Sequence, residues 1–126
     1  MSADKTASVH WTGAGKDGKG EISTETGALN KAPYGFASRF GDDRKATNPE
    51  EILAAAHAAC FAMAFSFACA AEGIQTETVD TSAKVRLAKE GDGFKIDRIA
   101  LTLNAKVPGL SQEQFDKIAA GAKAGC

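Results

Sequence analysis

A long apolar segment, residues 52–71, limits the folds open to this chain of 126 residues. The segment "TNPEE" before it carries the signals of a helix start: Asn48 or Thr47 can cap, Pro49 suits the first turn, and the two glutamates complement the helix dipole. Gly73 is a typical helix end. The pattern therefore predicts a helix of roughly 23 residues, about 35 Å long.

Segments with β-strand character flank this helix on both sides. Residues 6–27 contain two β-prone runs around the Gly- and Lys-rich turn "AGKDGK", which predicts a hairpin. Residues 78–107 alternate apolar and polar positions, and a shift in this alternation predicts a second hairpin with a bulge near Asp97 and Arg98. Between the first hairpin and the helix, residues 28–48 are interrupted by Pro, Gly and Asp, so we expect irregular chain with at most one short strand.

A second, shorter helix is expected near the end of the sequence. Ser111 is its N-cap, Gln114 stands at the capping-box position, and Gly125 ends it. The order of these elements indicates an α+β fold in a single domain, residues 1–126. One small sheet cannot enclose a long helix that is apolar on nearly every side, so we expect a homodimer in which a partner chain covers the remainder.

Charge and composition narrow the classes of function. The formal net charge is −1 and no basic stripe is present, so we expect no nucleic-acid partner and no anionic membrane partner. The apolar segment stands alone and contains His57 and Ser66, which favours a buried central helix over a membrane span. The start of the sequence lacks an apolar leader and the three cysteines form no even disulfide framework, so we expect a reducing compartment, the cytoplasm.

The stretch "GAGKDGKG" matches part of a phosphate-binding loop. Gly13, Gly18 and Lys19 fit the pattern G-x-x-x-x-G-K. Gly20, however, stands where that motif needs Ser or Thr to hold magnesium, and a strand instead of a helix is expected to follow. A lysine-rich hairpin turn is the better interpretation.

Two cysteines of the long helix cannot pair with each other. Cys60 and Cys69 lie nine residues apart, half a turn out of phase and about 13 Å apart along the axis, whereas a disulfide needs Cα atoms within about 7 Å. Cys69, within "FSFACAA", is expected to be a buried packing residue. Cys60 follows His57 by one turn, and an imidazole there could favour the thiolate or relay a proton. A histidine that only packs and bonds a carbonyl is the more common case.

The third cysteine, Cys126, is far enough from Cys60 in the sequence to be its partner in space, in a catalytic disulfide. His57, Cys60 and Cys126 would also supply three metal ligands. No closely spaced Cys or His pair is present to nucleate such a site, so we expect no metal.

Four blocks of the sequence, "GKGEISTETG", "PYGFASRF", "TNPEEILAAAHAACFAMAF" and "AKAGC", carry a family resemblance. In these blocks, and in their order over essentially the whole chain, the sequence resembles the OsmC branch of the OsmC/Ohr family of organic hydroperoxide reductases. The resemblance implies an intertwined α+β homodimer, with long central helices wrapped by antiparallel sheets from both chains. It also implies a thiol peroxidase without a cofactor, which acts on organic hydroperoxides and is reduced by an external dithiol, possible reductants including a lipoyl-type one.

The same resemblance implies roles for particular residues. Cys60 matches the peroxidatic cysteine, which becomes a sulfenic acid, and Cys126 matches the resolving cysteine, which then forms a disulfide with it. Arg39 matches the arginine that contacts the thiolate, and Glu50 the acid that orients this arginine. Cys69 matches no functional position of the family. Glu50 and Cys60 are ten residues apart, about 15 Å along a straight helix, so we favour a site at the dimer interface.

Two other functions remain as alternatives at this stage. A Cys–His hydrolase would use His57 and Cys60, but no third group is evident to orient the histidine. A dimeric stress-response binding protein with an apolar pocket would leave Cys60 inert. Aromatic residues around Cys60 would favour alkyl or aryl hydroperoxides as substrates. The family usually continues past its resolving cysteine with a helix and a strand, a segment that these 126 residues do not contain.

Overall fold

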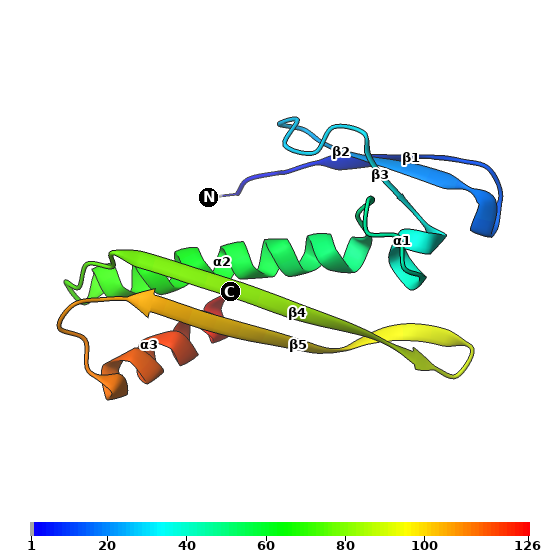
Figure 1. The fold of residues 1–126 in the computed structure, drawn as a ribbon. Helices are drawn as coiled ribbons and strands as arrows, with labels where there is room; N and C mark the ends of the chain where they lie inside the picture. Colours follow the sequence, from blue (N-terminus) through cyan, green and yellow to red (C-terminus); the bar gives the residue numbers. More distant parts are fainter. Residues whose placement is uncertain (1) are drawn as a thin grey trace. The chain divides into compact units, whose positions relative to one another are not determined.

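A computed structural model describes residues 2–126, in which the chain forms two compact units, one ending at Ile52 and the other beginning at Leu53. The elements follow one another as β1 (Ala7–Thr12), η1 (Gly15–Asp17), β2 (Lys19–Thr24), β3 (Ala32–Gly35), α1 (Phe36–Phe40), α2 (Pro49–Ala71), β4 (Thr78–Glu90), β5 (Gly93–Lys106) and α3 (Gln112–Gly125) (Figure 1). This order, with antiparallel sheets and one long helix, confirms the predicted α+β class. The single domain over residues 1–126 stays a prediction.

The first unit contains a three-stranded antiparallel sheet in the order β1-β2-β3. The predicted hairpin forms, with the short helix η1 in its turn, and β2 begins at Lys19 where a phosphate-binding loop would need a helix. The rings of Trp11 and Tyr34 lie 5.6 Å apart over Gly20, which leaves no space there for a side chain. Gly20, at the end of the "GAGKDGKG" stretch, therefore serves sheet packing.

Residues 28–48 are more regular than the sequence predicts. They contain the expected short strand, β3, but also the one-turn helix α1. Ser38 stabilises the start of this turn, because its Oγ accepts a hydrogen bond from the Gly35 amide at 3.0 Å and donates one to the Gly35 carbonyl at 3.1 Å. Such local side-chain bonds outweigh the Pro and Gly interruptions on which the prediction of irregular chain rested.

The long helix α2 has the predicted extent, 23 residues from Pro49 to Ala71. Gly73 follows it with a φ of 75°, a left-handed conformation that other residues adopt at a cost. The amide of Ile74 then donates to the carbonyl of Cys69 at 2.9 Å, which completes a Schellman ending.

In the second unit, β4 and β5 form an antiparallel pair with the predicted bulge. Arg86 faces Arg98 across the pair and Leu87 faces Ile96, so Asp97 is the extra residue. Asp97 accepts hydrogen bonds from Arg86 at 2.8 and 3.0 Å, which hold the pKa of its carboxyl below the ordinary value. The bulge thereby places the Asp97 carboxylate next to Arg86 and Arg98, two like charges that face each other across the strand pair.

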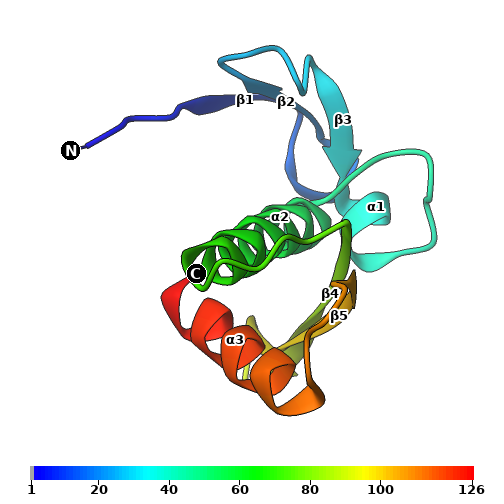
Figure 2. The same cartoon turned by 90° about the vertical axis from the view of Figure 1, so that its left-hand side faces the viewer.

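The core of the second unit lies between α2, α3 and the β4–β5 sheet (Figure 2). Helix α3 starts at the predicted cap, where Ser111 Oγ accepts from the Gln114 amide at 3.2 Å. The two helices pack through five buried side chains: Phe61, Phe65 and Cys69 of α2, with Ile118 and Ala122 of α3. The rings of Phe65 and Phe115 are 5.4 Å apart, near the start of α3.

The opposite side of α2 is apolar and uncovered in this chain. Its exposed residues recur at alternating spacings of three and four, and we call them the exposed stripe: Leu53, Ala56, Cys60, Met63, Phe67 and Ala70. Met63 is 61% exposed and Phe67 69%. By length and mean hydropathy, 1.9 over its most apolar window, α2 could also cross a bilayer, although core helices pass the same test. Within one chain, only one face of the predicted buried helix is buried.

A threonine connects the sheet to the backbone of α2. Thr81 Oγ1 donates a hydrogen bond to the Ala58 carbonyl at 2.8 Å. Replacing Thr81 by the isosteric valine should lower the free energy of unfolding by about 1 kcal/mol, because this bond is lost. Denaturant titration measures the change, with Thr81→Ser as the control that keeps the hydroxyl. Equal losses in both variants would show that the hydrogen bond does not contribute.

Candidate functional site

Cys60 lies in the middle of α2, on the exposed stripe. The helix holds it one turn after His57, as the sequence predicts, and His57 is half-buried. Among residues 2–126, no side chain forms a hydrogen bond or ion pair with the imidazole of His57. The residues that the structure describes thus give the Cys–His hydrolase alternative no support.

Cys126 follows α3 directly as its C-cap residue and forms a disulfide with Cys60. Their Cα atoms are 6.0 Å apart, although 66 positions separate them in the sequence. Packing of α3 against α2 explains this proximity. Because Phe115 at the start of α3 contacts Phe65, and the helices run in opposite directions, the end of α3 arrives beside the middle of α2 (Figures 1 and 2).

Cys69 lies on the other side of the same helix and is fully buried. Burial raises the pKa of its thiol above the ordinary value, and the charge of Glu72 adds to this effect. A buried neutral thiol is a poor nucleophile. Its position agrees with the prediction that Cys69 is a packing residue.

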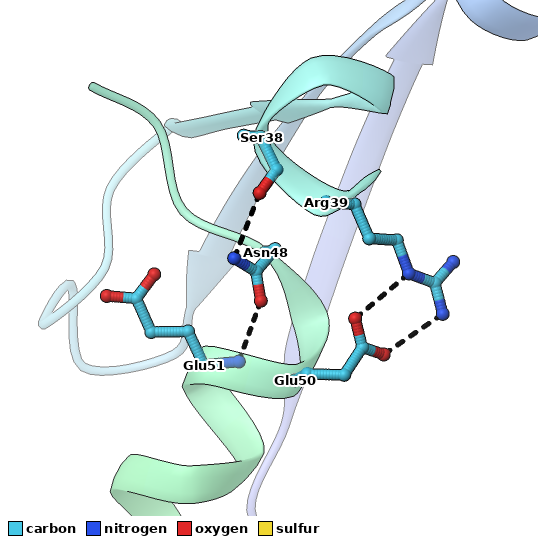
Figure 3. Close-up of polar contacts among 5 residues, drawn as sticks. All are labelled: Ser38, Arg39, Asn48, Glu50 and Glu51. Carbon is cyan, nitrogen blue, oxygen red and sulfur yellow. Dashed lines mark hydrogen bonds and ion pairs between the residues drawn. The ribbon is translucent and has the colours of Figure 1, made fainter. Parts of the chain in front are cut away.

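Arg39 and Glu50 form a bidentate ion pair in the first unit (Figure 3). Arg39 Nε donates to Glu50 Oε1 and Nη2 donates to Oε2, both at 3.0 Å. These hydrogen bonds, together with the charge of Glu50, raise the pKa of Arg39 above its ordinary value, so the guanidinium is a permanent cation. The Glu50 side chain is only 13% exposed, whereas that of Arg39 is 37% exposed. The carboxylate thus holds the guanidinium in place while part of the arginine side chain stays exposed.

The guanidinium has a second contact and one unused nitrogen. Its Cζ lies 5.1 Å from the centre of the Phe40 ring, a distance typical of a cation–π interaction. Since the ion pair uses Nε and Nη2, Nη1 points away from Glu50 (Figure 3). This nitrogen is available to bind an anion such as a thiolate or a developing alkoxide.

One polar residue near this pair was predicted only as a possible helix cap. Asn48 Oδ1 accepts from the Glu51 amide at 2.8 Å, which makes it the N-cap of α2. Its Nδ2 also donates to the Ser38 carbonyl at 3.1 Å, a contact that no sequence pattern indicates. The only sequence signal for this contact is the amide side chain itself, because an acid or a hydroxyl at position 48 would cap the helix equally well.

The four predicted site residues thus form two pairs. Cys60 is bonded to Cys126 in the second unit, and Arg39 to Glu50 in the first. No three His, Cys, Asp or Glu side chains gather into a possible metal site anywhere in residues 2–126. The Cys60–Cys126 pair can perform thiol redox chemistry, and the Arg39–Glu50 pair can offer a guanidinium N–H to an anion.

Known proteins similar to this chain are described as OsmC proteins or as organic hydroperoxide resistance proteins. The profile described as "OsmC-like protein" matches residues 41–126, which include Glu50, Cys60 and Cys126. "Peroxiredoxin OsmC" of Escherichia coli K12 is 48% identical over 126 residues, covering 100% of this chain and 87% of that protein. "Organic hydroperoxide resistance protein OhrA" of Bacillus subtilis is 34% identical over 122 residues, 96% of this chain and 83% of the relative.

Similarity to solved structures extends over nearly all of the chain. The organic hydroperoxide resistance protein OsmC of Legionella pneumophila superposes with a TM-score of 0.74 at 30% identity. The superposition covers 98% of this chain and 85% of that one. These relatives support the predicted fold, including the long helix between antiparallel sheets.

The three thiols should differ in their rate of alkylation because they differ in exposure. After reduction of the native protein, we expect iodoacetamide to alkylate Cys60 and Cys126 at least tenfold faster than Cys69, because the Cys69 thiol is buried and its pKa is raised. Mass spectrometry of timed samples measures the three rates, and unfolding in urea provides the control in which they should converge. Rapid labelling of Cys69 in the native protein would contradict its placement in the core.

Proposed function

Because this chain belongs to the OsmC-like protein family, we propose that it is a thiol-dependent peroxidase that reduces organic hydroperoxides to alcohols. The observation that carries this proposal is the disulfide between Cys60 and Cys126. It joins an exposed thiol in the middle of one helix to a thiol at the end of another, and it is the product that a two-cysteine peroxidase forms. An inert binding protein would not require this pairing.

The proposed reaction begins at Cys60. Its thiolate attacks one oxygen of the hydroperoxide, the O–O bond breaks, and the second oxygen leaves as an alkoxide that takes a proton to become the alcohol. Cys60 is then a sulfenic acid. The Cys126 thiol attacks the sulfenic sulfur, which releases water and forms the disulfide.

An external dithiol completes the cycle. Exchange with the Cys60–Cys126 disulfide returns both thiols and leaves the dithiol oxidised. A lipoyl-type dithiol is our candidate, because a dithiol whose two thiols stand close together on one chain reduces a disulfide with closure of its own ring. We place the protein in the cytoplasm, where such reductants are kept reduced.

Arg39 supplies the charge that this reaction needs. A guanidinium near Cys60 would favour the thiolate and stabilise the negative charge that grows on the departing oxygen. Glu50 holds the guanidinium by two hydrogen bonds and leaves Nη1 for this contact. We assign Glu50 the role of positioning Arg39, and we place the assembled site at the interface of a dimer.

The exposed stripe supports a homodimer built around α2. Residues at alternating spacings of three and four form the kind of seam through which two helices pack. A second copy of the chain would cover Met63 and Phe67 and would surround Cys60 with apolar side chains. Such surroundings favour alkyl and aryl hydroperoxides over hydrogen peroxide.

Peroxide consumption by cysteine variants tests the proposed reaction. With excess dithiol, the reduced protein should consume cumene hydroperoxide faster than hydrogen peroxide, and Cys60→Ser should abolish the difference because the nucleophile is lost. Cys126→Ser should still form one sulfenic acid per chain but should turn over slowly. Cys69→Ser is the matched control and should retain activity. Consumption that is indifferent to Cys60→Ser would exclude the thiol-peroxidase mechanism.

Substitution in the exposed stripe tests the dimer. We expect Phe67→Glu to weaken self-association on the order of 100-fold, because a carboxylate would be buried at the interface without a partner. Sedimentation velocity over a range of concentrations measures the change, with the apolar Phe67→Leu as its control. If Phe67→Glu associates as the unsubstituted protein does, the stripe is not the interface.

A further inference from the structure

We infer that Asn48 is a positioning residue for Arg39: its side-chain amide joins α1 to α2 and thereby fixes the backbone on both sides of the Arg39–Glu50 pair. This inference rests on the role proposed above for Arg39. It assigns to Asn48 a function in the reaction beyond capping a helix.

The observation is a pair of hydrogen bonds from one side chain, which we call the Asn48 bridge (Figure 3). Asn48 Nδ2 donates to the Ser38 carbonyl at 3.1 Å, and Asn48 Oδ1 accepts from the Glu51 amide at 2.8 Å. The last carbonyls of a helix and its first amides have no partner within that helix. The bridge satisfies one such carbonyl of α1 and one such amide of α2.

Capping alone does not require an asparagine at this position. Asp and Ser cap helices about as well as Asn does. Asp, however, offers only acceptors when ionised, and the Ser side chain is one atom shorter. Among these capping residues, Asn combines an acceptor for Glu51 with an N–H donor that reaches Ser38.

The two ends of the bridge flank the ion pair in the sequence. Ser38 directly precedes Arg39, and Glu50 lies between Asn48 and Glu51. The bridge therefore holds together the two backbone segments from which the paired side chains extend. Its Ser38 end is itself well fixed, because the Ser38 residue is only 7% exposed and its hydroxyl is hydrogen-bonded to Gly35.

Other contacts near this site do not replace the bridge. The Thr47 amide donates to the Pro33 carbonyl at 3.0 Å, which ties the start of α2 to β3 but not to α1. The Arg39–Glu50 pair also connects the two helices, but it does so only through its two side chains. The bridge instead binds a backbone carbonyl of α1 and a backbone amide of α2, so it fixes the two backbones directly.

A serine at position 48 separates positioning from capping. Asn48→Ser keeps a good cap and removes the donor to Ser38. We expect the second-order rate constant for oxidation of Cys60 by cumene hydroperoxide to fall about tenfold, because the cation is held less often where charge develops. The pH dependence of this step should move to higher pH, whereas the melting temperature and the rate of Cys126 resolution should stay near those of the unsubstituted protein.

A neighbouring threonine provides the matched control. Thr47 Oγ1 donates to Glu51 Oε2 at 3.3 Å, a bond at the same helix start that does not reach α1. Thr47→Val removes it and should leave Cys60 oxidation unchanged. Equal slowing by Thr47→Val and Asn48→Ser would show that any disturbance of this helix start has the same effect, and would overturn the inference.

A double-mutant cycle with Arg39→Ala distinguishes this inference from the proposal on which it rests. Arg39→Ala should slow Cys60 oxidation on the order of 100-fold, and Asn48→Ser should add less than about twofold in that background. If Arg39→Ala has no effect, the proposed role of Arg39 is wrong. If Arg39→Ala is slow but Asn48→Ser is normal, or if their effects multiply, Asn48 does not act through Arg39. If Asn48→Ser slows Cys60 oxidation but also lowers the melting temperature strongly, the positioning role is likewise wrong.

Discussion

Burial of an apolar helix is the constraint on which the rest of this structure depends. Within one chain, α2 buries Phe61, Phe65 and Cys69 against α3 and the β4–β5 sheet, which removes these side chains from water. The same packing aligns α3 so that its last residue reaches the middle of α2. The disulfide between Cys60 and Cys126 is therefore a consequence of how the core is filled, as much as of the two thiols.

The same helix explains why two of its thiols differ. Cys60 and Cys69 are half a turn out of phase, so one lies on the exposed stripe and the other in the core. Burial raises the pKa of the Cys69 thiol and favours its protonated form, whereas Cys60 is exposed in this chain. The helical periodicity of α2 thus decides which of the two cysteines packs in the core and which one is exposed to oxidants.

Much of this fold could be predicted from local sequence signals, whereas contacts between residues distant in the sequence could not. The end of α2 follows from the conformational freedom of Gly73, and the bulge at Asp97 follows from a shift in the apolar–polar alternation. Both signals are visible in a short window of sequence. Helix α1 and the bond from Asn48 to Ser38 depend on partners brought together by a loop, which no periodicity records. Pairing of Arg39 with Glu50 was expected from family resemblance alone, and the dimer and the catalytic roles stay predictions.

The stability of α1 has a consequence for the proposed chemistry. A helix of five residues is too short to form by itself in water, so its order comes from hydrogen bonds to Ser38 at one end and from Asn48 at the other. Arg39 extends from this turn, and Glu50 extends from the first turn of the much longer α2. Arg39 thus extends from the short helix α1, which depends on its attachment to α2 for its order. Helix α2 is also the helix that carries Cys60.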